Sequence, residues 1–120
     1  MSTRTARQAV DRASARRTKR TSVLKAMAHP SRLLILEALG DGERCVCDLQ
    51  RLVGSDISTV SKHLALMRRA GLVVDRRQGL QIFYSLRLPC MMGFFECVDA
   101  VLAATPASLP AGRRARACDR

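Results

Sequence analysis

The chain has 120 residues, enough for one small domain, and its formal net charge of +11 predicts a polyanionic partner, either nucleic acid or an anionic surface. No apolar run approaches the roughly 18 residues of a membrane-spanning helix, and the Arg-rich N-terminus lacks the apolar stretch of a secretory signal. We therefore expect a cytoplasmic protein without a membrane partner. The absence of a Cys-x-x-Cys, Ser/His/Asp or Gly-rich phosphate-binding pattern argues against an enzyme.

Most of the charge lies at the two ends of the chain. Residues 1–20 hold seven Arg or Lys against one acid, and residues 105–120 hold four against one, which leaves a net charge of +2 for residues 21–104. Pro106 and Pro110 precede the second basic run. We predict a basic N-terminal extension (1–19), a folded domain (20–104) and a flexible basic tail (105–120).

Three short helices are expected first. One starts near Val23 and ends before Pro30, since the residue preceding a proline disfavours the helical conformation. The next begins at Pro30 and ends at Gly40, and a third starts near Cys47 and ends before Gly54. The apolar positions of the second recur at helical spacing: Leu33, Leu34, Leu36 and Leu39.

A fourth helix is expected from Asp56 to Ala70, with Asp56 as its N-cap. Val60, Leu64 and Met67 form its core stripe. Two strands, Leu72 to Arg76 and Gln81 to Leu86, then flank a Gly-bearing turn. Two helices joined by a tight turn and followed by a hairpin predict a mainly α winged helix-turn-helix with a small β-hairpin.

In such a fold the fourth helix enters the DNA major groove and the hairpin reaches the adjacent backbone. For His63, which borders the apolar stripe, a packed position is the alternative to DNA contact. The predicted DNA-binding residues are Ser58, Thr59, Ser61, Lys62, His63, Arg76, Arg77 and Gln78.

The last helix, from about Pro89 to Ala103, has an apolar face too wide for a surface helix. Burial of that face in a second subunit would enlarge a small core, which predicts a homodimer. The interface residues are Met91, Phe94, Phe95, Val98, Val101 and Leu102.

Three motifs stand out in this part of the chain: Ala28-His29-Pro30-Ser31-Arg32-Leu33-Leu34-Ile35-Leu36, Ser58-Thr59-Val60-Ser61-Lys62-His63-Leu64 and Leu66-Met67-Arg68-Arg69-Ala70-Gly71-Leu72-Val73. Together they resemble the ArsR/SmtB family of metal- and arsenic-sensing repressors, over roughly residues 20–104. The resemblance implies a homodimer on an inverted-repeat operator, released when an inducer binds; no cofactor is expected for DNA binding.

The arsenic-sensing branch carries Glu-Leu-Cys-Val-Cys-Asp-Leu-Cys, which is similar to residues 43–50 of this chain. Cys45 and Cys47 match the first two thiolate ligands of arsenic(III) or antimony(III), and Gln50 replaces the third. Positions i and i+2 point about 200° apart on a helix, so one ion can bridge the pair only where the helix is absent or distorted. Packing of both as small apolar side chains is the alternative.

The third ligand is assigned to Cys90, with Cys97, Cys118 or no further thiol as alternatives. Other inducers remain open, because thiolates also bind Cd, Zn and Pb and also undergo oxidation or persulfidation. A basic DNA-binding protein without any ligand is a further alternative.

Overall fold

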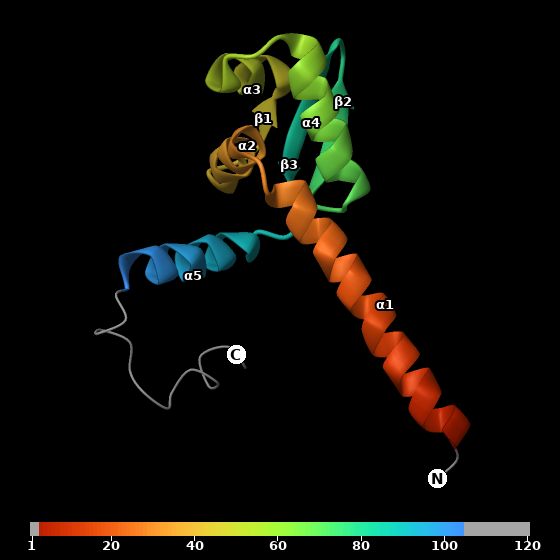
Figure 1. The fold of residues 1–120 in the computed structure, drawn as a ribbon. Coiled ribbons are helices and arrows are strands. Elements are labelled where there is room, and N and C mark those ends of the chain that lie inside the picture. Colours follow the sequence, from red (N-terminus) through yellow and green to blue (C-terminus); the bar gives the residue numbers. More distant parts are fainter. Residues whose placement is uncertain (1–2, 105–120) are drawn as a thin grey trace. The chain divides into compact units, whose positions relative to one another are not determined.

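The computed structural model describes residues 3–104, in which five helices and three short strands follow one another along the chain (Figure 1). Their bounds are α1 (Thr3–Met27), α2 (Pro30–Gly40), β1 (Arg44–Cys45), α3 (Val46–Val53), α4 (Ile57–Arg69), β2 (Val73–Gln78), β3 (Gln81–Leu86) and α5 (Met91–Ala103). The first unit of the structure extends to Pro89 and the second begins at Cys90. The predicted mainly α fold with a β-hairpin is confirmed.

The first helix is much longer than predicted. It begins at Thr3 instead of near Val23, and only Ala26 and Met27 are buried. The sequence between these points is rich in Arg and Ala, which favour helix by intrinsic propensity, and it lacks an apolar stripe. Apolar periodicity therefore could not reveal it. The helix passes through residues 19–20, and the division into extension, domain and tail stays a prediction; residues 105–120 lie outside the described part.

The helix α2 starts as expected at Pro30 and supplies much of the core. The ring of His29 caps it, because its Nδ1 accepts a hydrogen bond of 3.1 Å from the backbone N–H of Ser31. Ile35, Leu36 and Leu39 are buried. Of the leucines at helical spacing, Leu36 and Leu39 are buried, whereas Leu33 and Leu34 are half-buried. The helix packs against α3, α4 and β3.

The helix-turn-helix consists of α3 and α4. Gly54 ends α3 in the left-handed conformation (φ 79°), where its N–H bonds to the carbonyl of Gln50 at 2.9 Å. Asp56 then caps α4, as predicted, by accepting a hydrogen bond of 2.8 Å from the N–H of Thr59. The predicted stripe of α4 is also confirmed: Val60, Leu64 and Met67 are at most 1% exposed.

The wing is a three-stranded antiparallel sheet in the order β1-β3-β2, one strand more than predicted. The hairpin runs to Gln78 and turns through Gly79 and Leu80, and Gly79 (φ 63°) occupies the first central position, as a type II′ turn requires. On the other edge, Arg44 pairs with Tyr84 and Cys45 with Phe83. A two-residue strand carries too few residues for a period-2 pattern, so β1 could not be predicted from the sequence.

The second unit contains α5, which begins two residues after the predicted Pro89. None of its residues is buried, and Phe94, Val98, Val101 and Leu102 are exposed by 40% to 78%. No helix among residues 3–104 is both long and apolar enough to cross a membrane.

Candidate DNA-reading surface and thiol site

The exposed face of α4 carries four of the predicted DNA-binding residues. Ser58, Thr59, Ser61 and Lys62 are all exposed on it. Hydrogen bonds from Thr59 lower the pKa of the Asp56 carboxyl, with a smaller contribution from the charge of Lys62. Thr59 therefore takes part in the cap, while Ser58, Ser61 and Lys62 are presented at the start of the helix.

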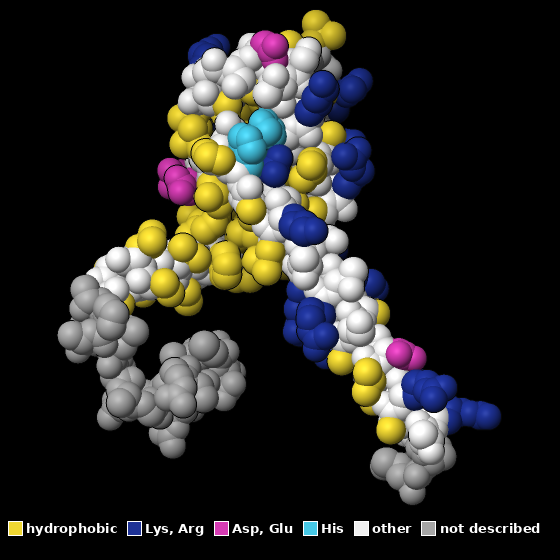
Figure 2. Space-filling model, in the orientation of Figure 1, with side chains coloured by type: hydrophobic (Ala, Val, Ile, Leu, Met, Phe, Trp, Pro, Cys, Tyr) yellow, Lys and Arg dark blue, Asp and Glu magenta, His cyan; other side chains and the backbone are white. Residues whose placement is uncertain are grey.

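His63 lies on a different side of α4, half-buried against the start of α2. Its ring centroid is 4.6 Å from that of His29, and its Nδ1 is 3.2 Å from Nη1 of Arg32. Figure 2 shows the two histidines as one cluster on the surface of the first unit. Burial, then electrostatic interactions with His29 and Arg32, lower the pKa of His63. The surroundings match the packed alternative, and DNA contact by His63 stays a prediction.

Arg32 joins α1, α2 and α4 and was missed as a structural residue in the sequence. Its Nη2 donates to the carbonyl of Lys25 at 3.4 Å while Nη1 meets His63. The three residues lie up to 38 positions apart in the chain, so no local pattern predicts their contact.

On the wing, the guanidinium of Arg76 is bound by the carboxylate of Glu43. Its Nε donates to Glu43 Oε2 at 3.1 Å and its Nη2 to Glu43 Oε1 at 2.6 Å. These bonds lower the pKa of the Glu43 carboxyl and raise the pKa of Arg76. Glu43 and Arg76 are 33 positions apart in the chain, so no local pattern predicts that Glu43 binds Arg76.

The two remaining wing residues differ in their surroundings. Gln78 accepts a hydrogen bond of 2.7 Å from Nη1 of Arg76, so its side chain belongs to the same cluster as Glu43. Arg77 is exposed, and within the described residues no hydrogen bond or ion pair of its side chain is found. All of its guanidinium N–H groups are therefore available to a phosphate.

Cys45 and Cys47 line one cavity of about 290 Å³ between α4 and the wing. Cys45 is buried and extended (φ −78°, ψ 159°) and precedes α3, whereas Cys47 is exposed in its first turn. Because Cys45 is not helical, the 200° separation of i and i+2 positions does not apply to this pair. Besides Val46, the other residues of the wall are Ile57, Ser61, Leu64, Leu80, Gln81, Ile82 and Tyr84.

The remaining thiols of the described chain belong to the second unit. Cys90 precedes α5 as its N-cap, makes no side-chain cap hydrogen bond and is exposed, as is Cys97. Cys118 lies outside the described residues. Within residues 3–104, no group of three or more His, Cys, Asp or Glu side chains is arranged to hold a metal ion, so the identity of a third ligand stays a prediction.

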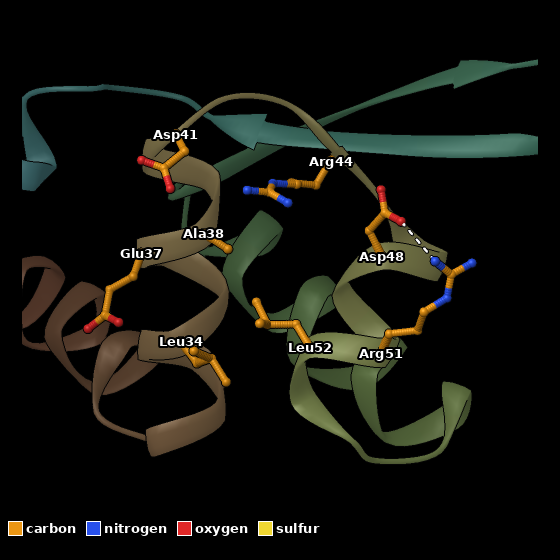
Figure 3. Close-up of a pocket in the computed structure, with 8 residues that line it drawn as sticks. All are labelled: Leu34, Glu37, Ala38, Asp41, Arg44, Asp48, Arg51 and Leu52. Atoms are coloured by element: carbon orange, nitrogen blue, oxygen red, sulfur yellow. Dashed lines mark ion pairs between the residues drawn. The ribbon is translucent and has the colours of Figure 1, made fainter.

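A larger cavity, of about 530 Å³, lies between α2 and α3 (Figure 3). Its polar wall includes Asp48, which pairs with Arg51 at 3.5 Å, and its apolar wall includes Leu34 and Leu52. No residue of α4 and neither cysteine borders it. Although this cavity is the larger of the two, the candidate thiol pair borders the smaller cavity instead.

These elements define a winged helix-turn-helix regulatory protein. The family model of bacterial regulatory proteins of the arsR family matches residues 29–74. The chain is 40% identical over 83 residues to the HTH-type transcriptional regulator YgaV of Escherichia coli, covering 68% of this chain and 77% of that protein. The chain belongs to the ArsR family.

Two other relatives match over a shorter stretch of the chain. NmtR, an HTH-type transcriptional regulator of Mycobacterium tuberculosis, is 48% identical over 65 residues, 54% of each chain. The arsenical resistance operon repressor of Escherichia coli is 42% identical over 65 residues, 53% of this chain and 56% of that protein. These two matches span about half of each relative, so they do not decide the inducer.

The solved structures agree on the fold. A homodimeric winged helix-turn-helix DNA-binding domain from Mycobacterium bovis has a TM-score of 0.69 at 33% identity, covering 77% of this chain and 85% of that one. The transcriptional repressor BigR from Xylella fastidiosa has a TM-score of 0.66 at 28% identity, covering 79% and 97%.

Arg77→Ala is expected to weaken binding to all DNA sequences and to lower the salt slope of binding by about 0.9, the value for one lost phosphate contact on duplex DNA. The slope is measured by titrating labelled operator DNA at several salt concentrations. Arg51→Ala is the control, because it removes the same charge from α3 at a residue bordering the other cavity. Equal slopes for Arg77→Ala and wild type would place the wing tip off the DNA backbone.

The His63 environment predicts a pH-dependent stability. The folded-state pKa is lowered from 6.5, so the unfolded chain binds the proton more readily. The contribution of the neutral His63 ring to the folding stability is therefore fully present above about pH 6.5, and it is lost as the pH falls through 6.5 toward the folded-state pKa. Urea unfolding at about pH 8 and about pH 5.5 measures this, and His63→Gln should reduce the difference between the two midpoints. The same difference in wild type and His63→Gln would assign it to other groups.

Proposed function

We propose that the chain is a homodimeric, operator-binding transcriptional repressor that is released when trivalent arsenic or antimony binds the thiolates of Cys45 and Cys47. The observation that supports this proposal is that both cysteines border one cavity whose other walls are α4 and the wing. A ligand there lies between the two elements that read DNA.

The chemistry of ligand exchange suits this pair. Each thiol displaces one hydroxyl group of As(OH)₃ and supplies the proton that leaves with it as water. Two thiols thus form a dithiolate that keeps one hydroxyl on arsenic, and a third thiol can replace that group by the same exchange. Soft thiolates select such thiophilic ions over Mg or Ca.

DNA reading is assigned to α4 and the wing. The helix presents Ser58, Ser61 and Lys62 on the exposed surface of its N-terminal half. The DNA major groove is wide enough to admit one α-helix, so these side chains can reach the bases. Arg77 contacts the backbone beside it. The dimer places two such helices on an inverted repeat, with the paired α5 faces as the interface.

The inducer assignment depends on the cysteine pair and not on the degree of identity to any relative. Cd, Zn and Pb at the same thiols are the nearest alternatives, followed by oxidation or persulfidation of Cys47, which is exposed. A titration of operator-bound protein with arsenite, each metal and a persulfide donor distinguishes them by which agent releases DNA at the lowest concentration.

Cys45→Ser and Cys47→Ser are each expected to retain operator binding and to abolish release by arsenite. The ligand-free site is the DNA-binding state, and serine does not provide a soft ligand. Release is measured by fluorescence anisotropy of labelled operator DNA during an arsenite titration of the reduced protein.

Cys118→Ser is the control and should respond as wild type does. Cys90→Ser and Cys97→Ser identify the third ligand: loss of response in one of them assigns it, and a full response in both leaves a two-thiolate site. Wild-type release from the Cys45→Ser/Cys47→Ser double variant would contradict the assignment of this pair.

The dimer is expected to depend on α5. Phe94→Asp or Val98→Asp would bury an unpaired charge in the interface and should shift the protein to monomers, with a loss of operator affinity. Analytical ultracentrifugation measures the mass, and Glu96→Gln on the same helix is the control. A wild-type chain that is monomeric at micromolar concentration would rule out this interface.

A further inference from the structure

The guanidinium of Arg76 is fixed on three sides before DNA arrives. Glu43 holds Nε and Nη2 at 3.1 Å and 2.6 Å, Gln78 accepts from Nη1 at 2.7 Å, and the ring of Phe83 lies 5.0 Å from the guanidinium carbon. A guanidinium has five N–H donors, so one on each terminal nitrogen remains free. The cluster leaves Arg76 able to meet a phosphate in a fixed orientation.

The same cluster continues across the sheet to the thiol site. Phe83 on β3 pairs with Arg76 on one side and with Cys45 on the other, so these three residues form one row across the three strands. Glu43 lies just before β1, two positions from Cys45. The carboxylate that orients Arg76 is thus attached to the short segment that carries one of the two thiols.

We infer that Glu43 is the positioning residue that transmits ligand binding at Cys45 and Cys47 to Arg76 on the wing; this inference rests on the proposed function. In the DNA-binding state Glu43 orients Arg76 toward the phosphate backbone. Ligand binding moves Glu43 away, and Arg76 loses that orientation.

The backbone around the thiols explains why Glu43 moves. Cys45 is buried in β1 while Cys47 is exposed on α3, and a single ion has to bring both sulfur atoms within bonding distance. Strand β1 has only two residues, so few ladder hydrogen bonds resist its displacement. The displacement of Cys45 passes through Arg44 to Glu43.

The test is a double-mutant cycle with Glu43→Gln, Arg76→Ala and the double variant in the full-length protein. The quantity measured is the ratio of operator dissociation constants with and without saturating arsenite. We expect Glu43→Gln to reduce the wild-type ratio by about two- to fivefold, the range for a half-exposed ion pair. Arg76→Ala should reduce it equally, and the double variant should show no further loss.

Asp75→Asn is the matched control, because Asp75 lies next to Arg76 on β2 and pairs with Arg68 at 3.0 Å. It should retain the wild-type ratio. A carboxylate that merely repels DNA would change both dissociation constants equally, so an unchanged ratio in Glu43→Gln overturns the inference. A further loss on adding Glu43→Gln to Arg76→Ala also overturns it, whereas failure of arsenite to release the wild type contradicts the proposed function instead.

Discussion

The pairing of Cys45 with Phe83 is the constraint on which the arrangement of the site depends. It adds β1 to the wing and so joins the segment before α3 to the hairpin that follows α4. It also holds Cys45 in an extended backbone conformation, so that Cys45 and Cys47 line the same cavity. Two thiols at positions i and i+2 of one helix would instead point about 200° apart.

The start of α3 lacks the side-chain cap that the starts of α2 and α4 both have. The helix α2 is capped by the His29 ring and α4 by the Asp56 carboxylate, but Cys45 makes no side-chain cap hydrogen bond to α3. Capping hydrogen bonds satisfy backbone N–H groups that have no partner in the first turn. The turn that carries Cys47 can therefore rearrange without the loss of such a bond, whereas α4 keeps its cap and its buried stripe.

How much the sequence predicted depends on whether a feature is local. The stripe of Val60, Leu64 and Met67 and the cap at Asp56 follow from spacings within one helix, and both were predicted. The length of α1 was missed because propensity and not apolar spacing maintains it. Three features were missed because their partners are distant in the chain. Arg32 contacts His63, 31 positions away, and Glu43 binds Arg76, 33 positions away. Strand β1 exists through its pairing with β3, which a single sequence does not reveal.

Under the proposed function, two separate surfaces cooperate for release from an operator. The apolar face of α5 would fix the spacing of two recognition helices across a dyad, and a change there acts on both half-sites together. A ligand at Cys45 and Cys47 would act within one subunit, because Ser61 of α4 and Ile82 of the wing line the same cavity. A ligand that alters the distance between these elements disturbs base reading and backbone contact in the same subunit. Since phosphate contacts set the register in which bases are read, a small displacement of the wing weakens both.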